Sequence, residues 1–311
     1  MDFEKLSTHP LQTHAWADFR KTWGNEVVET KYGILTLHRI PLLNKKIGMF
    51  IRGPKPTKEM LSDLINIAEK HNLIFIKLEP DVLKSDFDMK TFKNFNIKKG
   101  KTLFTPTSYW IDLTKSVPDF MDSFKPKTRY NIRLANKKGV EVMEDNSDKA
   151  FNKYLSLMKE TVQRQGFYAH SEKYHRLMWE TLRKAGIAHL LIAKYNKKIH
   201  TAWIVFKWKD RLYYPYGASS HKEKNIQASS AMMWGAINFG KIEKLKTFDL
   251  WGREKDKGFT YFKESFNPKV VEFLGTWDLV IDQNLYNLYL ILEKFRWIVL
   301  RLKSRFIKPN F

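Results

Sequence analysis

The chain has 311 residues, of which 43% are hydrophobic and 14% aromatic. This supply of apolar side chains is enough for a folded core and excludes wholesale disorder. The length suits two domains of ordinary size. There is no cysteine, which excludes disulfides, thiolate catalysis and cysteine-ligated metals.

The charge balance is strongly basic, with 55 Lys and Arg against 33 Asp and Glu and a formal net charge of +22. A Lys-rich genome would raise the lysine content without suppressing acids, so the excess favours a surface for RNA, nucleotides or anionic lipid. The N-terminus lacks the charged-then-apolar pattern of a signal peptide. No stretch reaches about 18 uncharged apolar residues, and we therefore expect a cytoplasmic protein.

Helical and strand-like patterns alternate along the chain. The first hundred residues predict helices at 8–23, 57–71 and 92–96, and strands at 27–29, 34–39, 46–51 and 73–78. The rest predicts strands at 109–113, 140–143, 188–195, 201–208, 211–216 and 247–250, and helices at 117–124, 149–165, 172–185 and 228–241. This succession predicts the α/β (mixed α+β) class.

A run of cations occupies residues 125–138, with no acid among them. If its latter part is helical, Arg129, Arg133 and Lys137 lie at i, i+4 and i+8 on one face. Like charges placed in this way repel each other, and a nearby anion would relieve the repulsion. Both a solvated face and a polyanion-binding face stay open.

Two later segments combine aromatic and small residues. Residues 213–220 predict an edge strand whose small residues allow close backbone approach to a ligand, although ordinary sheet packing is the alternative. Residues 249–252 end a strand and enter a polar loop that leads to Lys263. A lysine buried among aromatics would be a fixed cation suited to stabilising an oxyanion, whereas a solvated loop lysine would have no such role.

The C-terminal stretch 285–306 predicts a long, basic helix with an apolar stripe. The stripe consists of Leu288, Ile291, Leu292, Phe295, Ile298, Val299 and Leu302. Its packing on the first domain and a lipid-facing amphipathic surface are both open.

The chain lacks the common metal and nucleotide motifs. Its histidines show no HxxxH-like pairing with a carboxylate, and GxxxxGK[ST], GxGxxG and GxSxG are absent. These absences disfavour P-loop NTPases, Rossmann enzymes and serine hydrolases. We expect neither a metal nor another cofactor.

Seven segments, in their order and spacing, resemble the FemABX family of tRNA-dependent aminoacyltransferases, which build the peptide side branches of peptidoglycan. They are residues 11–16 (LQTHAW), 52–54 (RGP), 77–80 (KLEP), 128–133 (TRYNIR), 216–220 (YGASS), 249–252 (DLWG) and 262–263 (FK). The resemblance covers about residues 7–290 and implies two tandem GNAT-like acyltransferase domains. We expect them at 1–105 and 106–276, with a C-terminal helix, 277–311, that packs back on the first. The stretch 166–187 leaves no room for the long coiled-coil arm of some members.

The resemblance further implies that an amino acid passes from aminoacyl-tRNA to an amine of the peptidoglycan stem peptide, carried by lipid II or UDP-MurNAc-pentapeptide. It places Lys263 and Phe262 at the reacting ester and Glu79 next to the acceptor, where the nearest family pattern has Asp. The substrate contacts it implies are Arg20, Tyr174, Tyr216 and His170, the last at a position where the family has an arginine. The basic run would bind tRNA through Lys127, Arg129, Arg133 and Lys137.

In that mechanism the stem-peptide amine attacks the ester carbonyl, Lys263 stabilises the oxyanion and Glu79 accepts the amine proton. Glu79 could instead be a structural strand-end carboxylate. One alternative function is a GNAT-type N-acyltransferase that uses acyl-CoA, although residues 224–228, which precede a predicted helix, hold no glycine. The other is a non-catalytic RNA- or membrane-surface-binding protein. We expect a monomer, with peripheral contact at the inner membrane face left open.

Overall fold

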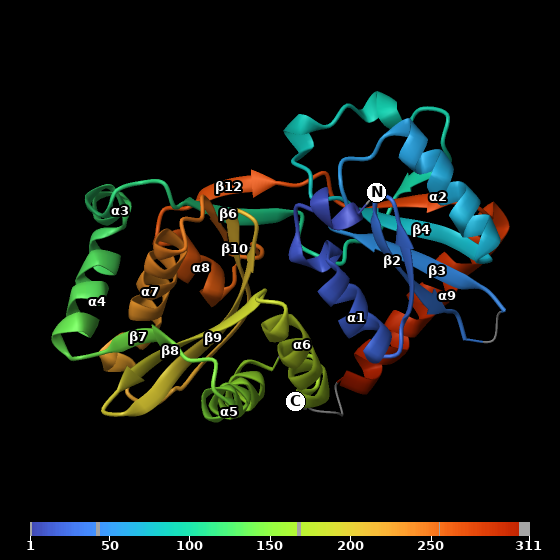
Figure 1. Cartoon of the computed structure of the whole chain (residues 1–311). Coiled ribbons are helices and arrows are strands. Elements are labelled where there is room, and N and C mark those ends of the chain that lie inside the picture. The colour runs from blue at the N-terminus through green and yellow to red at the C-terminus, as the bar shows by residue number, and fades with distance from the viewer. Residues whose placement is uncertain (1, 42–43, 167–168, 255, 305–311) are drawn as a thin grey trace. The chain divides into compact units, whose positions relative to one another are not determined.

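The chain forms two compact units, each built on its own mixed sheet (Figure 1). The computed structural model describes residues 2–41, 44–166, 169–254 and 256–304. Of the described residues, those up to Pro106 and those from Glu272 onward form one unit, and Thr107–Val271 form the other. The first unit is therefore made from both ends of the chain.

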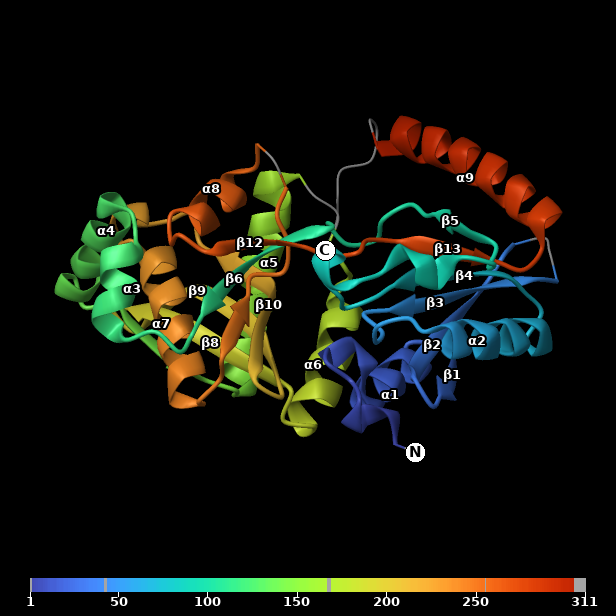
Figure 2. The same ribbon diagram turned by 90° about the horizontal axis from the view of Figure 1, so that it is seen from above.

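The sheet of the first unit has six strands. In spatial order they are β1 (Glu26–Thr30), β2 (Gly33–Arg39), β3 (Lys46–Ile51), β4 (Leu73–Glu79), β13 (Trp277–Val280) and β5 (Ile97–Lys99). β3 and β4 are parallel and are joined by α2 (Lys58–Lys70), while the other neighbours are antiparallel. Helix α2 covers one face, and α9 (Gln283–Ser304) lies over the other (Figure 2).

The predicted helix at 57–71 is confirmed, but the one at 8–23 is wrong in its first turn. Residues Pro10–Gln12 form a 3₁₀ turn, and α1 runs over His14–Thr22. The Thr13 hydroxyl accepts a hydrogen bond from the Trp16 N–H at 3.1 Å. This cap satisfies a first-turn donor and fixes the start of the helix at His14.

The sheet of the second unit has seven strands. In spatial order they are β12 (Lys269–Glu272), β6 (Thr107–Asp112), β11 (Thr247–Asp249), β10 (Arg211–Ser219), β9 (Lys198–Trp208), β8 (Ala188–Tyr195) and β7 (Glu141–Glu144). Its helices are α3 (Val117–Ser123), α4 (Pro126–Lys137), α5 (Asp148–Gln165), α6 (Glu172–Lys184), α7 (Ala228–Ile242) and α8 (Gly258–Glu264). Helices α4, α7 and α8 lie over one face, and α5 and α6 over the other (Figure 1). The predicted mixed α/β class is confirmed, and the close succession of α5 and α6 leaves no long arm.

The prediction that residues 213–220 form an edge strand is wrong, because β10 lies inside the sheet between β9 and β11. Strand β9 pairs with β10 as far as Ser219, with a bulge between Tyr213 and Tyr216. In contrast, β11 pairs with β10 only over Arg211–Tyr213. Among the described residues, no strand therefore neighbours β10 on one side beyond Tyr213, although the strand itself is internal.

The predicted helix 277–311 also needs correction. Residues Trp277–Val280 form β13, which lies between β4 and β5. Its Leu279 and Val280 are buried, and α9 begins only at Gln283. Helix α9 packs on the first unit through Tyr286, which is 2% exposed, and not through the predicted apolar stripe. Residues 305–311 lie outside the described part.

A buried ion pair joins β4, β13 and α9. Lys77 Nζ donates to Asp278 Oδ1 at 2.7 Å and to the Lys101 carbonyl at 3.1 Å, and the Tyr286 hydroxyl donates to Asp278 Oδ2 at 3.0 Å. Burial raises the pKa of Asp278, and the Lys77 ammonium opposes that rise. Removing one partner would leave the other charge buried without compensation.

We predict that Asp278→Ala lowers the free energy of unfolding by about 3–5 kcal/mol, measured by urea denaturation. The control Glu26→Gln breaks the more exposed pair of Glu26 with Lys46, whose atoms are 2.7 Å apart, and should cost less than about 1 kcal/mol. Equal effects of the two substitutions would contradict the role given to the Lys77–Asp278 pair.

Candidate functional site

Lys263 is the most buried lysine among the candidate site residues, with 7% of its surface exposed. It lies on α8, and its ammonium donates to the carbonyl of Leu250 at 2.7 Å and to that of Gly252 at 3.0 Å. The Phe259 ring centroid is 5.1 Å from Nζ and the Tyr214 ring centroid 5.8 Å. The alternative of a solvated loop lysine is therefore wrong, because residues 258–264 form a helix that turns this side chain inward.

The two carbonyls that hold Lys263 belong to a turn fixed by Asp249. The Asp249 carboxylate accepts hydrogen bonds from the Trp251 N–H at 2.7 Å, from the Trp110 indole at 2.8 Å and from the Ser108 hydroxyl at 2.5 Å. Ser108 in turn accepts from the Gly252 N–H at 3.0 Å. Trp251 has a φ of 65° and Gly252 one of 125°, so these bonds stabilise a left-handed turn. Asp249 thereby positions Lys263 through the backbone.

Burial lowers the pKa of Lys263 to about 8, while the charges of Asp249 and Glu254 oppose that fall. The group is therefore charged through most of the neutral range and loses its proton a little above it. An ammonium has three N–H donors, and the two carbonyls take two of them. Among the described residues no further hydrogen-bond acceptor is found for it, so one donor is available to a ligand oxygen.

The open edge of β10 lies beside this lysine. Tyr214 stacks on Trp203 of β9 with ring centroids 3.8 Å apart. Its hydroxyl occupies the place that a Cβ at residue 217 would take, so only glycine fits at Gly217. The Tyr214 side chain thus packs directly against the backbone of Gly217 at this strand edge. Phe262, also on α8, packs on the core against Phe266 at 5.3 Å.

A group of stacked rings involves the other face of the sheet, which α5 and α6 cover. Tyr216 of β10 lies 4.8 Å from His175 of α6, and His170 stacks on Tyr174 at 3.9 Å. Burial lowers the pKa of His175 to about 3, so this ring is neutral. The structure thus brings together three of the predicted substrate contacts: His170, Tyr174 and Tyr216. His175 was not predicted, because a histidine on a helix carries no signal of its neighbours.

The basic run is helical in α4, which meets the condition for its cations to share a face, but these cations differ in role. The Arg129 guanidinium donates to the carbonyls of Phe124 at 2.7 Å, Asp122 at 3.3 Å and Met121 at 3.4 Å. It therefore satisfies the C-terminal end of α3, where a cation is favourable. Of the other three predicted tRNA contacts, Lys127, Arg133 and Lys137, all are exposed.

A polar pocket of about 370 Å³ lies at the N-terminus of α7, and its lining includes Arg164, His200, Thr201 and Lys224. His200 is 8% exposed, and no hydrogen bond to its Nδ1 is found among the described residues. No side-chain hydrogen bond from the described part of the chain caps α7. First-turn N–H groups, a positive helix end and nearby cations are features that suit an anion, although Glu223 also lines the pocket, 3.5 Å from His200. Lys138, next to α4, donates to the Asn225 carbonyl at 3.0 Å, which connects the basic helix to this pocket.

The first unit holds Arg20 and Glu79, on different elements. Arg20 lies on α1. The pKa of His38 is lowered mainly by the burial of its own ring and, to a smaller extent, by the charge of Arg20. Glu79 ends β4 with 4% of its surface exposed, and its Oε1 accepts from the Phe104 N–H at 3.0 Å. Its Oε2 has no hydrogen bond to the described residues. Burial raises the pKa of Glu79, which suits a group that accepts a proton near neutral pH.

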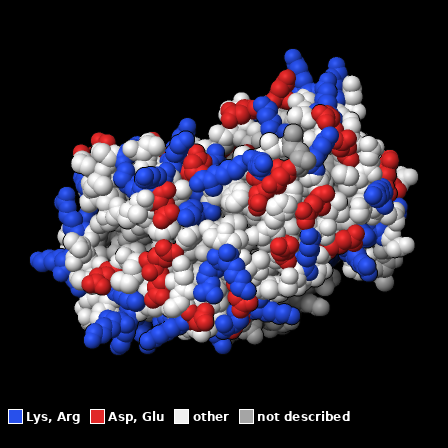
Figure 3. Space-filling model, viewed as in Figure 1, with Lys and Arg blue, Asp and Glu red and all other residues white. Residues whose placement is uncertain are grey.

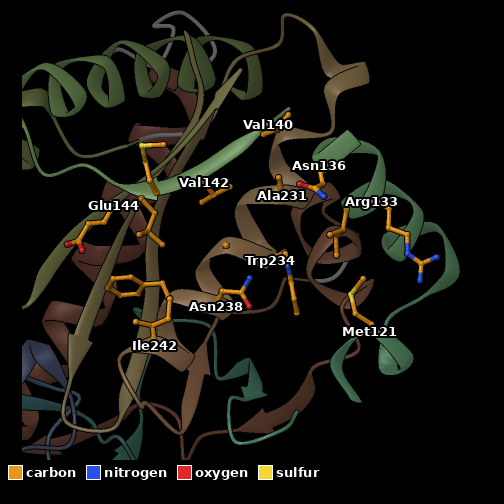
Figure 4. A pocket seen from close by; sticks show the side chains of 15 residues that line it. Met121, Arg133, Asn136, Val140, Val142, Glu144, Ala231, Trp234, Asn238 and Ile242 are labelled. Atoms are coloured by element: carbon orange, nitrogen blue, oxygen red, sulfur yellow. The ribbon is translucent and has the colours of Figure 1, made fainter. Parts of the chain in front are cut away.

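A second, mostly apolar cavity of about 510 Å³ lies between α4, α7 and β7 (Figure 4). Trp234 and Val142 are among its lining side chains, whereas the Arg133 guanidinium points away from it. The cavity therefore does not use the guanidinium of Arg133, and the carboxylate in its lining, Glu144, is already paired with His189 at 2.6 Å.

Charge alone does not mark a site. On the face shown in Figure 3, Lys and Arg side chains are interspersed with Asp and Glu.

In the described part of the chain, one cluster has metal-compatible spacing: Asp2, Glu4 and His14. The His14 ring already lies 3.2 Å from Asp2 and 3.3 Å from Glu29, so ion pairing accounts for this cluster. None of the helices formed by the described residues has the length and hydropathy to cross a membrane.

Comparisons with known proteins point to one family. The model of the acetyltransferase (GNAT) domain matches residues 123–264. The chain is 22% identical to the lipid II:glycine glycyltransferase of Staphylococcus aureus (strain USA300), over 91% of each chain. It superimposes on the crystal structure of FemX with a TM-score of 0.82 and 19% identity, covering 92% of this chain and 97% of that one. The C-terminal domain of a putative lysylphosphatidylglycerol synthetase from Agrobacterium fabrum gives a TM-score of 0.61 at 10% identity, with 93% and 94% covered.

The two sheets, each with a parallel pair joined by a helix, define a tandem GNAT-like fold. Over nearly the whole chain, these similarities agree with a resemblance to the FemABX family. The resemblance read from the seven sequence segments is confirmed.

We predict that one lysine titrates near pH 8 in ¹³Cε NMR of lysine-labelled protein, and that its signal is absent from Lys263→Met. Asp249→Asn removes a negative charge that raises this pKa, so the titration should move to lower pH. The control Asp210→Asn, at an exposed position, should leave it in place. An unchanged midpoint in Asp249→Asn would contradict the electrostatic coupling.

Proposed function

We propose that this protein is an aminoacyltransferase that moves an amino acid from aminoacyl-tRNA to an amine of the peptidoglycan stem peptide, on lipid II or UDP-MurNAc-pentapeptide. The observation that carries the proposal is the buried Lys263 ammonium, held by two carbonyls beside the open edge of β10. The similarity to a protein named lipid II:glycine glycyltransferase supports the substrate class. The tandem fold shared with FemX supports the architecture such a reaction needs.

The chemistry requires charge stabilisation more than a nucleophilic side chain. The nitrogen of a neutral amine attacks the ester carbonyl carbon, a C–N bond forms, and negative charge develops on the carbonyl oxygen. The remaining N–H of Lys263 would donate to that oxygen in a site of low dielectric, where such a bond is strong. The C–O bond to the ribose then breaks, and the ribose oxygen leaves as a hydroxyl. Glu79 is our candidate for the group that accepts the proton lost by the amine.

Two positively charged features of the second unit support binding of the aminoacyl-tRNA donor. The pocket at the N-terminus of α7 suits a phosphodiester near the 3′ end of the RNA. The exposed cations of α4 suit the phosphates further along the strand. Lys138 connects α4 to the loop of that pocket. For the acceptor, the rings of His170, Tyr174 and Tyr216 offer stacking and hydrogen-bonding surfaces, and Arg20 is a candidate for its phosphates.

A GNAT-type N-acyltransferase that uses acyl-CoA is the second candidate, because the matching family model is an acetyltransferase domain and the α7 pocket also suits a pyrophosphate. Its loop, however, has Glu223 at a φ of 54° and Gln227 at 59°. Side chains there, in place of glycine, reduce the room for backbone N–H groups to surround a pyrophosphate.

The test of the proposed function is a transfer assay with labelled aminoacyl-tRNA or labelled acyl-CoA as donor and lipid II or UDP-MurNAc-pentapeptide as acceptor. Label should enter the muropeptide from tRNA. Transfer from the CoA ester alone would favour the second candidate. RNA binding without transfer from either donor would contradict both.

In this assay, Lys263→Ala should lower the rate of transfer about 100- to 1000-fold, because an oxyanion donor is lost. Lys257→Ala is the matched control: the residue immediately precedes α8 and is exposed, and its loss should leave the rate within about twofold of the wild type. Full activity of Lys263→Ala would remove the oxyanion role.

The basic helix gives a separate prediction for tRNA binding. Lys127→Ala, Arg133→Ala and Lys137→Ala should each weaken binding and lower the slope of log affinity against log salt by roughly 0.7–0.9. Arg129→Ala should act chiefly by lowering stability, since it removes the cap of α3. Lys153→Ala, exposed on α5, is the control. Unchanged salt slopes in all three variants would contradict an RNA-binding role for α4, and filter binding over a salt series measures them.

A further inference from the structure

Helix α9 presents an apolar face that the described residues leave exposed. Six residues of the predicted stripe are 41–62% exposed: Leu288, Ile291, Leu292, Phe295, Ile298 and Val299. Their i, i+3, i+4 and i+7 spacing places them on one side of the helix. A continuous apolar face of this kind on a soluble surface marks an interaction site.

The opposite side of α9 holds the helix on the first unit. Tyr286 packs edge-on against Phe75 with centroids 5.2 Å apart, and its hydroxyl donates to Asp278. Further along, Lys101 Nζ lies 3.8 Å from the Trp297 ring centroid and 3.6 Å from Glu293 Oε1. These contacts fix the orientation of the helix, so the six apolar side chains face outward in the folded unit.

The charged residues of α9 indicate what kind of partner this apolar face binds. Glu293 is the only acid in the sequence of the helix, and it lies on the packed side beside Lys101. Lys294 and Arg296 are exposed, and the 100° advance per residue places them on the two flanks of the apolar stripe. Cations flanking a stripe of Leu, Ile and Phe are typical of helices that lie in the interface of an anionic bilayer.

We propose that α9 docks this protein on an anionic lipid surface, with the stripe at the acyl boundary and Lys294 and Arg296 among the headgroups. The helix lies in the plane of the interface and does not cross it. A second copy of the chain fits less well, because it would place the same cations against one another within a protein of net charge +22. The proposal stands on α9 alone and does not depend on the transfer reaction.

The test is flotation of the full chain with vesicles of phosphatidylcholine, with or without phosphatidylglycerol. The wild-type chain should float with the phosphatidylglycerol vesicles, and Ile291→Ser/Phe295→Ser/Ile298→Ser should partition about tenfold less. Ile242→Ser, which alters a side chain that is 77% exposed on the second unit, is the matched control and should float like the wild type. Thermal melts should be unchanged, because all of these side chains are exposed.

The charged flanks are tested by Lys294→Gln/Arg296→Gln. This variant should lose affinity for phosphatidylglycerol vesicles, as should the wild type when the salt is raised to about 1 M, where the Debye length falls to about 3 Å. Equal flotation of the wild type and the triple variant would overturn the proposal. So would a dimer in sedimentation velocity that the triple variant abolishes, if the wild-type chain does not float.

Discussion

The hydrogen bonds from the Lys263 ammonium to the carbonyls of Leu250 and Gly252 are the interaction on which the site depends. An ammonium buried to this degree needs acceptors, since desolvation of a charge is costly. The Asp249 carboxylate supplies them indirectly, because it fixes the turn that presents both carbonyls. The same desolvation that lowers the lysine pKa to about 8 would strengthen any hydrogen bond it donates to a developing oxyanion.

The strands β10 and β11 separate beside that lysine. The two strands pair over three residues, and beyond Tyr213 none of the described strands pairs with β10 on that side. Helix α8 brings Lys263 to this opening from the face that α7 covers, and the ring group of Tyr216 and His175 borders it from the face of α6. In the proposed function, this arrangement would let two substrates approach one strand edge from opposite faces of the sheet.

Periodicity predicted most of the helices and their alternation with strands, because the buried faces repeat at 3.6 or 2 residues. It missed β13 and α8, since segments of four and seven residues give too few repeats to recognise. The burial of Lys263 depends on its position in α8, so the sequence pattern could not predict it either. Arg129 and Arg133 have the same sequence signal, yet one caps α3 and the other is exposed, because only the fold decides which carbonyls lie nearby. The apolar stripe of α9 was recognised correctly. That it faces outward depends on the packing of Tyr286 and its hydrogen bond to Asp278, and the periodicity of the stripe does not contain this contact.

The most direct test of the central claim is a crystal structure with a short RNA that ends in an amide-linked aminoacyl-adenosine, a stable analogue of the ester. The account predicts that the aminoacyl carbonyl oxygen lies about 2.7–3.1 Å from Lys263 Nζ, at the open edge of β10, with a phosphate in the pocket at the N-terminus of α7. An aminoacyl group bound away from β10, with Lys263 still held only by Leu250 and Gly252, would contradict it.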